Sequence, residues 1–395
     1  MNRRIASRMS AISPSLTLAI TAKAKAMKAA GEPVVSFGVG EPDFNTPKNI
    51  IDAAKAALDK GYTKYTPSSG LLPLRKAICE KFKKDNGLDY EPSQIIVSDG
   101  AKHSIFNACF ALIEEGDEVI IPAPYWLTYP EVVKVCGGVP VYLECRKEDK
   151  FKFTPARLAA AITPKTKMLI FNSPSNPTGA VYTEEEVRAI AKVCEEKEIF
   201  VLSDEIYEKL CYDGVKPFSV AACSEKMKEL TVTVNGVSKT YAMTGWRLGF
   251  VCAPPEVDDA VFKIHQYSIL CAPIMAQYAA VEALKDGFSD NFSAVEEMRD
   301  SYDRRRRFVL QSLKDTGLPC VEPKGAFYAF PSVAPSGLNG EDFAEKLLKE
   351  QKVALVPGSA FGDFGARNVR LSYATGMSAL SEAFERISNF MNSIK

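Results

Sequence analysis

The chain has 395 residues and is 46% hydrophobic, which is enough to bury a large core, and its length is typical of about two domains. Its 49 Lys and Arg balance 49 Asp and Glu, so there is no overall basic field for nucleic acid or an anionic membrane. It contains neither a long apolar run nor a signal-peptide pattern. We therefore expect a cytoplasmic protein that binds neither nucleic acid nor membrane.

Cysteine and histidine are not placed as in common metal sites. None of the ten cysteines forms a C-x-x-C pair, and the histidines are only His103 and His265. We therefore predict no metal. Most cysteines lie among apolar residues, which favours buried, reduced core thiols.

In chain order, the first predicted elements are a short amphipathic helix, a strand-like run broken by glycine and proline, and a second helix. The helices are expected over 16–30 and 48–60, because Gly31 and Gly61 follow them directly.

From about residue 92 onward, short apolar runs alternate with helical stretches. Strands that alternate with helices form parallel sheets covered on both faces, so we predict an α/β fold with a mostly parallel seven-stranded sheet between helices. The expected strands are 95–97, 119–121, 139–143, 168–171, 200–202, 231–234 and 248–252. The expected helical stretches include 101–113, 184–197 and 255–285.

After residue 286 the pattern is typical of a smaller α+β domain. We expect, in order, a long charged helix at 290–315, a strand at 327–330, a helix at 340–350, strands at 354–356 and 369–373, and a final helix at 378–394. The four arginines at 304–307 could form an anion site or a solvated helix face, and we favour the solvated face.

Two segments that follow predicted strands could bind an anion or hold a polar side chain. Open α/β sheets bind ligands at such positions. Small residues at 98–101 leave backbone N–H groups free for a phosphate. Two prolines and a glycine at 172–179 form a rigid turn that would fix Asn176. Taken alone, each segment could also be an ordinary connection.

Two further segments carry groups that need a partner. Asp204 directly follows a very apolar strand, and a protonated pyridine nitrogen would satisfy this buried carboxylate. Tyr207 can face the same site if a turn begins there. Lys239 lies among small and apolar residues, which lower a lysine pKa and favour the neutral amine that a Schiff base requires. Ser238 and Arg247 beside it can bind a phosphate dianion.

Together these segments resemble the class-I aminotransferases, a fold-type-I family that depends on pyridoxal 5′-phosphate (PLP). The segment SKTYAMTGWRLG at 238–249 is similar to the family's cofactor-attachment motif. Further similar segments are GEPDF at 40–44, TKYTPSSG at 63–70, PAPYW at 122–126, NSPSNPTG at 172–179, SDEIY at 203–207, KGAFY at 324–328 and VRLSYA at 369–374. The most similar subgroup is the bacterial aspartate aminotransferases, which includes aspartate/prephenate aminotransferases.

The resemblance implies three domain segments. Residues 1–47 would form an N-terminal arm and part of the small domain, residues 48–285 the large PLP-binding domain, and residues 286–395 the small C-terminal domain.

The resemblance also implies the catalytic residues. Lys239 would carry the cofactor as a Schiff base and then move the substrate's proton. Asp204 would keep the ring nitrogen protonated, which makes the ring an electron sink. Tyr207 and Asn176 would hydrogen-bond the ring oxygen, and Trp126 would stack on the ring.

By the same resemblance, the phosphate would be bound by Ser238, Arg247 and the backbone of Gly100 and Ala101. Tyr65 would reach the phosphate of a neighbouring subunit, which implies a homodimer with shared active sites. The chain differs from many relatives at Gly236, where they carry a second phosphate-binding serine. One phosphate contact is therefore in doubt.

On the substrate side, Arg370 would hold the α-carboxylate as a bidentate pair, together with Asn176 and Trp126. Gly40 would let the N-terminal segment approach that carboxylate closely. Lys102 is the candidate for a distal carboxylate, although it could also be an ordinary surface lysine.

These residues predict transfer of the amino group from L-aspartate to 2-oxoglutarate, giving oxaloacetate and L-glutamate in a ping-pong reaction. Prephenate is the second candidate acceptor. Thr17 matches a residue linked with that activity, but Ser13 stands where several such relatives carry lysine. Another PLP reaction, such as that of a β-lyase, is the third interpretation.

Overall fold

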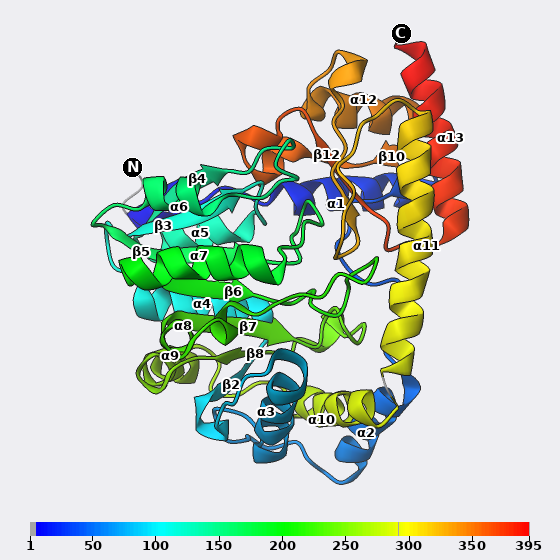
Figure 1. Cartoon of the computed structure of the whole chain (residues 1–395). Coiled ribbons are helices and arrows are strands. Elements are labelled where there is room, and N and C mark those ends of the chain that lie inside the picture. The colour runs from blue at the N-terminus through cyan, green and yellow to red at the C-terminus, as the bar shows by residue number, and fades with distance from the viewer. Residues whose placement is uncertain (1–4, 291, 395) are drawn as a thin grey trace.

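The computed structural model describes residues 5–290 and 292–394. Its main feature is one sheet of seven strands in the order β2-β8-β7-β6-β5-β3-β4 (Figure 1). The strands are β2 (Ile95–Ser98), β3 (Glu118–Ala123), β4 (Val139–Glu144), β5 (Thr166–Asn172), β6 (Phe200–Asp204), β7 (Thr231–Gly236) and β8 (Gly249–Cys252). Only β8 runs antiparallel to its neighbours among these strands. The predicted mostly parallel sheet is confirmed.

Helices cover both faces of this sheet because successive strand residues point to opposite sides. Ile96 packs on one face, while Ile95 and Val97 pack on the other. The helices on the first face are α4 (Ala101–Leu112), α5 (Thr128–Val135) and α9 (Pro255–Ser268). Those on the second are α6 (Pro155–Ala161), α7 (Glu184–Lys197), α8 (Glu225–Leu230), α2 (Lys48–Asp59), α3 (Leu72–Asn86) and α10 (Ile274–Ser289).

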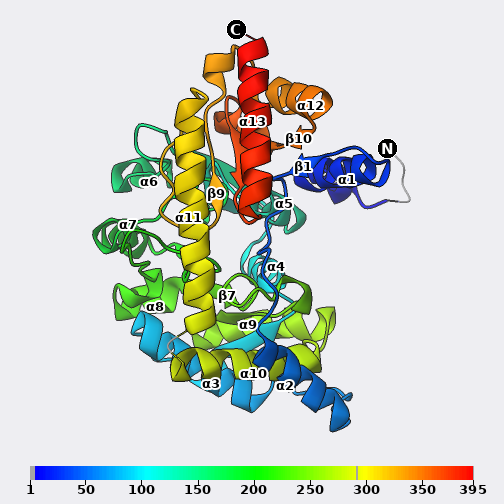
Figure 2. The ribbon, with the colours of Figure 1, turned by 90° about the vertical axis from the view of Figure 1, so that its right-hand side faces the viewer.

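The remaining chain forms a smaller α+β part with its own core. The strands are β1 (Val35–Ser36), which pairs with β10 (Val353–Ala354), and β11 (Val356–Pro357), β12 (Val369–Ser372) and β9 (Tyr328–Ala329), which form a separate sheet. The helices are α1 (Leu16–Ala29), α11 (Ser293–Asp315), α12 (Gly340–Gln351) and α13 (Met377–Ser393). Helices α11 and α13 run side by side (Figure 2). The domain boundaries at residues 47 and 285 stay a prediction.

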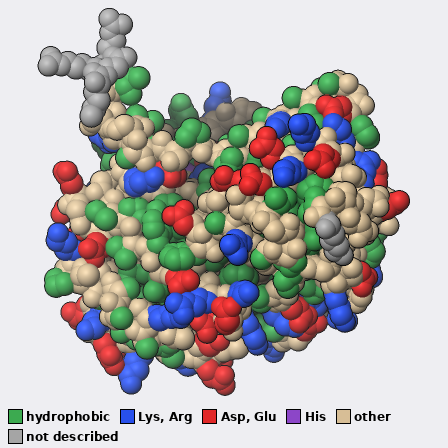
Figure 3. All heavy atoms as spheres, turned by 90° about the horizontal axis from the view of Figure 1, so that it is seen from above, with side chains coloured by type: hydrophobic (Ala, Val, Ile, Leu, Met, Phe, Trp, Pro, Cys, Tyr) green, Lys and Arg blue, Asp and Glu red, His purple; other side chains and the backbone are tan. Residues whose placement is uncertain are grey.

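Short 3-10 helices complete the described elements. They are η1 (Ser7–Ala11), η2 (Pro92–Gln94), η3 (Val220–Ala222), η4 (Thr244–Trp246), η5 (Ala334–Ser336), η6 (Gly358–Phe361) and η7 (Asp363–Gly365). Seen from above, the surface mixes acidic, basic and hydrophobic side chains without gathering one charge (Figure 3).

Two predicted elements are each divided in the structure. The helical stretch 255–285 consists of α9 and α10, because Leu270 has a φ of +66° and Pro273 precedes the second helix. The predicted strand 354–356 consists of β10 and β11, which pair with different partners on either side of Leu355.

The arginine run in α11 is not a solvated face throughout. Arg304 and Arg307 are exposed, but Arg305 is buried and pairs with Asp43 at 2.7 Å. The Arg306 side chain is only 1% exposed. Our interpretation is therefore wrong for two of the four arginines, because α11 packs this side against the rest of the chain.

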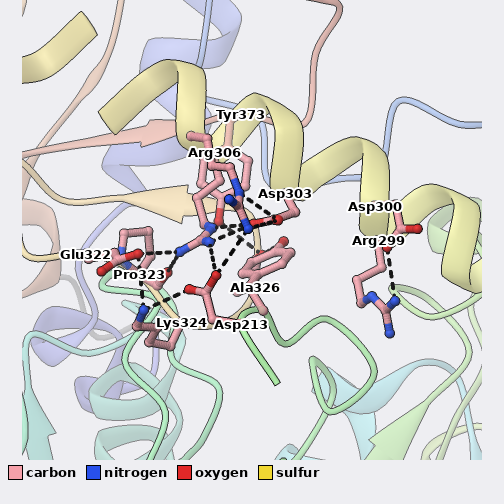
Figure 4. A network of polar contacts seen from close by, with 12 residues as sticks. Asp213, Arg299, Asp300, Asp303, Arg306, Glu322, Pro323, Lys324, Ala326 and Tyr373 are labelled. Carbon is pink, nitrogen blue, oxygen red and sulfur yellow. Dashed lines mark hydrogen bonds and ion pairs between the residues drawn. The ribbon is translucent and has the colours of Figure 1, made fainter. Parts of the chain in front are cut away.

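Arg306 links three separate segments (Figure 4). Its guanidinium lies 2.8 Å from Asp213, 2.7 Å from Asp303 of its own helix and 2.9 Å from Glu322. It also donates to the carbonyl of Pro323 at 3.1 Å. The network fastens α11 to the turn after β6 and to the segment that leads into β9.

Candidate active site

A cavity of about 610 Å³ lies beyond the carboxyl ends of β5, β6 and β7. The start of α4, the helix α5 and the N-terminal segment also bound it. Of the residues that the sequence analysis assigned to a site, those that line this cavity are Thr17, Gly40, Ala101, Lys102, Trp126, Asn176, Asp204, Tyr207, Ser238, Lys239, Arg247 and Arg370. Side chains far apart in the sequence therefore meet in one place.

An anion cradle lies at the start of α4. Gly100 has a φ of +82°, which favours glycine. A Cβ at this position would lie 2.4 Å from Arg247 Nη2, so the missing side chain lets the guanidinium lie against the turn. Arg247 donates to the carbonyl of Thr244 at 2.9 Å, and it has no carboxylate partner among the described residues. A helix N-terminus beside an unpaired guanidinium attracts an anion.

Asp204 ends β6 and is buried. One carboxylate oxygen accepts the Tyr129 hydroxyl at 2.7 Å, and the other accepts the Ile206 N–H at 3.3 Å. Burial raises the pKa of Asp204 to about 6, although the bond from Tyr129 lowers it. Within the described part of the chain, no salt bridge reaches this carboxylate, although the charge of Lys239 also lowers its pKa. Asp204 therefore lacks the positive partner that a buried carboxylate needs.

Tyr129 is a site residue that the sequence analysis missed. It lines the cavity three residues after Trp126, and the two rings meet edge to face with centroids 5.4 Å apart. The three-residue spacing from Trp126 was the sequence signal that could have identified Tyr129, because residues three apart share a face once a helical turn forms.

Lys239 follows β7 in a turn and lines the cavity. Its Nζ donates to the carbonyl of Gly40 at 2.6 Å. Burial lowers the pKa of Lys239 to about 8, while the charge of Glu41 acts in the opposite direction. Burial is the main cause of this lowering, which agrees with the apolar neighbours of Lys239 in the sequence.

Tyr207 turns its hydroxyl toward a second tyrosine that the sequence analysis also missed. The hydroxyl oxygens of Tyr207 and Tyr328 are 2.9 Å apart, and both residues line the cavity. Burial raises the pKa of Tyr207 well above its usual value, so this hydroxyl keeps its proton near neutral pH.

Arg370 lies on β12 and is buried at the cavity wall. Its guanidinium donates to Asn176 Oδ1 at 3.0 Å and to the carbonyl of Gly38 at 2.7 Å. It packs against the rings of Tyr328 and Phe361, with centroid distances of 4.6 and 4.9 Å. Its Nε has no hydrogen-bond partner in the described chain. A buried guanidinium with donors to spare can bind a carboxylate.

Lys102 is the second cation on the substrate side. Its Nζ lies 4.9 Å from the centroid of the Trp126 ring. Lys102 is exposed, but partial burial of its amine still lowers its pKa, and the charge of Arg247 adds to this effect. Across the described residues no carboxylate pairs with it. Thr17, whose hydroxyl lies 3.0 Å from that of Ser15, lines the same cavity.

Tyr65 lies outside the cavity. Its side chain is 85% exposed and lines a shallow surface pocket with Thr63, Lys64 and residues 271–274. It can therefore serve a site only on another copy of the chain or after a rearrangement of its own chain.

The described residues include no group of three or more His, Cys, Asp and Glu side chains placed to hold a metal ion. Across the same residues, every helix is too short or too polar to span a bilayer. All ten cysteines are free, four of them buried and six half-buried, so the expectation of buried thiols holds only in part.

Residues 32–387 match the family model "Aminotransferase class I and II". Because this match covers most of the chain, the protein belongs to the class I and II aminotransferase family.

Individual relatives match along nearly the whole chain. An aspartate aminotransferase of Bacillus subtilis is 48% identical over 98% of this chain and 99% of its own length. A probable aspartate/prephenate aminotransferase of Aquifex aeolicus is 46% identical over 100% of both. The solved structure of the Thermus thermophilus aspartate aminotransferase with maleate superimposes with a TM-score of 0.94 at 42% identity, over 98% of this chain and 99% of that one.

Proposed function

We propose that the cavity binds pyridoxal 5′-phosphate and that Lys239 is the residue to which the cofactor is attached. Three observations support this fit. The unpaired Arg247 beside the start of α4 suits a phosphate. Asp204, which is buried without a cation partner, suits a protonated pyridine nitrogen. Lys239 has the lowered pKa that a reactive amine requires. When bound, this cofactor supplies an electron sink for a carbanion at the substrate Cα.

The side chains of the cavity then hold the reacting groups and move the proton. Asp204 would hold the pyridine nitrogen in its protonated form, and this cation would keep Asp204 ionised despite its burial. Lys239 Nζ would take the proton from the substrate Cα and pass it to the C4′ atom of the cofactor. Tyr207 and Asn176 would orient the cofactor ring through hydrogen bonds to its oxygen, and the Trp126 ring would pack against it.

The class of substrate is indicated by two cationic side chains in the cavity that are not assigned to the cofactor. Arg370 and Lys102 both line the cavity, and neither has a carboxylate partner in the described chain. This observation carries our conclusion that the substrate is a dicarboxylic amino acid. The reaction is transfer of the amino group from L-aspartate to 2-oxoglutarate, giving oxaloacetate and L-glutamate in a ping-pong sequence. The names of the Bacillus subtilis and Thermus thermophilus relatives support it.

Prephenate is the second candidate acceptor. The name of the Aquifex aeolicus relative and the position of Thr17 in the cavity wall support it. Ser13 lines the same wall and carries no charge, so it adds no cation for the ring carboxylate of prephenate. We therefore rank prephenate after the aspartate and 2-oxoglutarate pair, and a β-lyase reaction after both.

The same proposal includes a homodimer. Tyr65 is exposed and lies outside the cavity of its own chain, as expected if it completes the phosphate site of a partner.

The test compares two amino donors in the Lys102→Ala variant. The KM for aspartate should rise by about 10- to 100-fold, because a charged hydrogen bond contributes about 1.5–3 kcal/mol. The KM for alanine, which has no distal carboxylate, should change little. Lys102→Arg is the matched control, since it keeps the charge and should retain most of the aspartate affinity.

Two outcomes would overturn the proposed substrate. An equal effect of Lys102→Ala on aspartate and alanine would show that Lys102 does not meet a distal carboxylate. Faster turnover of prephenate than of oxaloacetate by the wild-type protein would reverse the ranking.

A further inference from the structure

A buried second tyrosine lies directly behind Tyr207. Tyr328 on β9 is 1% exposed, and its hydroxyl oxygen is 2.9 Å from that of Tyr207. Within the described chain this is the only hydrogen bond of the Tyr328 side chain. A buried hydroxyl without a partner is costly, so the two hydroxyls satisfy one another.

The backbone holds the Tyr328 hydroxyl in place. A Cβ at Gly40 would lie 2.5 Å from this oxygen, so only glycine leaves room for it. The carbonyl of the same Gly40 accepts the bond from Lys239. The Tyr328 hydroxyl therefore fills a space between Tyr207 and the backbone that holds the lysine.

The two tyrosines are also joined through the main chain. The Ala326 N–H donates to the Leu210 carbonyl at 2.8 Å, and the Tyr212 N–H donates to the Lys324 carbonyl at 2.9 Å. The segment that carries Tyr328 is thus bonded to the residues that directly follow Tyr207. This pairing limits how far one hydroxyl can move from the other.

The number of protons sets the direction of the hydrogen bond. Each tyrosine hydroxyl has one proton to donate. If Tyr207 donates its proton to a ring oxygen in the cavity, it can only accept from Tyr328. The Arg370 guanidinium lies 4.6 Å from the centroid of the Tyr328 ring, and its charge lowers the pKa of both tyrosine hydroxyls against the effect of burial, so the proton count decides the direction.

We propose that Tyr328 is a positioning residue that donates its hydrogen bond to Tyr207 and thereby directs the Tyr207 proton into the cavity. This inference rests on the proposed cofactor site. It adds a residue of the small α+β part to the groups that set the proton affinity of the bound cofactor.

The test uses purified protein loaded with pyridoxal 5′-phosphate and follows its visible absorbance from pH 5 to pH 10. The readout is the pH midpoint of the colour change of the lysine-bound cofactor, which requires no turnover. Tyr207→Phe should raise this midpoint by about one pH unit, or roughly tenfold in proton affinity, because a donor to the ionised ring oxygen is lost. Tyr328→Phe should raise it by about 0.5 unit, or roughly threefold.

The double variant tests whether Tyr328 acts through Tyr207. In a chain that already carries Tyr207→Phe, the added Tyr328→Phe change should leave the midpoint where it is. Tyr302→Phe is the matched control, because Tyr302 is equally buried and packs against the same Phe327 ring, with centroids 5.5 Å apart. The Tyr302 hydroxyl has no hydrogen bond to Tyr207, so the pH midpoint of the Tyr302→Phe variant should equal that of the wild type. Thermal unfolding of each loaded protein verifies the fold.

The failures can be told apart. If Tyr207→Phe shifts the midpoint but Tyr328→Phe does not, the cofactor site stands and the role of Tyr328 is wrong. If Tyr328→Phe shifts the midpoint by the same amount in the wild-type protein and in the Tyr207→Phe variant, Tyr328 acts by another route. The inference is then also wrong. If Tyr207→Phe itself shifts nothing, the proposed position of Tyr207 fails and the inference fails with it.

Discussion

Lys239 is the residue whose chemistry depends most on its surroundings. Its pKa falls to about 8 by burial, so it is protonated below this pH and neutral above it. At pH 7 roughly 10% of such an amine is neutral, against under about 0.1% for an ordinary lysine. Uptake of pyridoxal phosphate by the cofactor-free protein should therefore accelerate about tenfold per pH unit up to pH 8 and level off above it. Stopped-flow absorbance between pH 6 and pH 9 measures this rate.

Two controls isolate the lysine in that experiment. Methoxyamine, which is already neutral across this pH range, reacts with free pyridoxal phosphate at each pH and corrects for the titration of pyridoxal phosphate itself. Lys239→Ala protein should show no uptake into the visible band. A corrected rate that keeps rising tenfold per pH unit up to pH 9 would mean that Lys239 has an ordinary pKa.

Tyr129 supports the carboxylate that the pyridine nitrogen is proposed to meet. Its hydroxyl is 2.7 Å from Asp204, and this bond lowers a carboxyl pKa that burial raises. Tyr129→Phe should therefore raise the Asp204 pKa further and lower kcat by about tenfold, a loss of about 1.4 kcal/mol. The KM for aspartate should change less, because Arg370 and Lys102 are intact. Steady-state measurement of kcat and of the KM for aspartate tests both expectations.

The Tyr129 prediction has a clear contrary result. Turnover equal to that of the wild type would show that the Ile206 N–H, 3.3 Å away, holds Asp204 without the tyrosine.

Residues in contiguous motifs were predictable, whereas partners far apart in sequence were not. Asp204 and Lys239 each follow an apolar strand, so their neighbours in the sequence indicate burial and function. Tyr129 lies 75 residues from Asp204, and Tyr328 lies 121 residues from Tyr207. Only the fold brings these hydroxyls to their partners, and the sequence analysis named neither of them.

At the scale of elements, prediction succeeded where the apolar pattern is continuous. All seven strands of the large sheet were predicted because each is a short apolar run between turns. The helix α3 was missed, since its charged surface obscures the apolar positions. The strands β10 and β11 were predicted as one strand, because the local sequence does not show that they pair with different partners.

The N-terminus of α7 gives an element-scale prediction. The Thr183 hydroxyl accepts the Glu186 N–H at 3.3 Å, while the Glu186 carboxylate accepts the Thr183 N–H at 2.8 Å. Thr183→Ala should lower the free energy of unfolding by about 1 kcal/mol. Turnover should be unchanged, because no residue of α7 lines the cavity.

Urea unfolding of the loaded protein, with Thr183→Ser as the control, measures the capping effect. The serine variant keeps the capping oxygen and should unfold near the wild-type midpoint. If serine and alanine destabilise equally, the lost methyl group rather than the cap explains the change.

At the scale of the whole molecule, the cavity within one chain contains every assigned site residue except Tyr65 and the backbone turn at Gly100. Tyr65 lies on the surface beside residues 271–274, and Tyr267 is 94% exposed nearby in the sequence. Exposed large aromatic side chains of this kind are typical of interaction surfaces. This arrangement supports a site that is completed by a second copy of the chain.

Mixed dimers can decide which chain Tyr65 serves. In the trans arrangement one subunit carries Tyr65→Phe and the other carries Lys239→Ala. In the cis arrangement one subunit carries both changes and its partner is wild type. If Tyr65 serves the partner, the trans dimer has one site with both residues intact, whereas the cis dimer has none.

Each mixed dimer is purified through two different affinity tags and assayed with aspartate and 2-oxoglutarate. The trans dimer should reach about half the wild-type activity per dimer, since one of its two sites is intact. The cis dimer should show only the low activity of a site that lacks the Tyr65 hydroxyl. The reverse order would place Tyr65 at the site of its own chain, because the wild-type subunit of the cis dimer would then be complete. Equal activities would mean that the Tyr65 hydroxyl contributes to neither site.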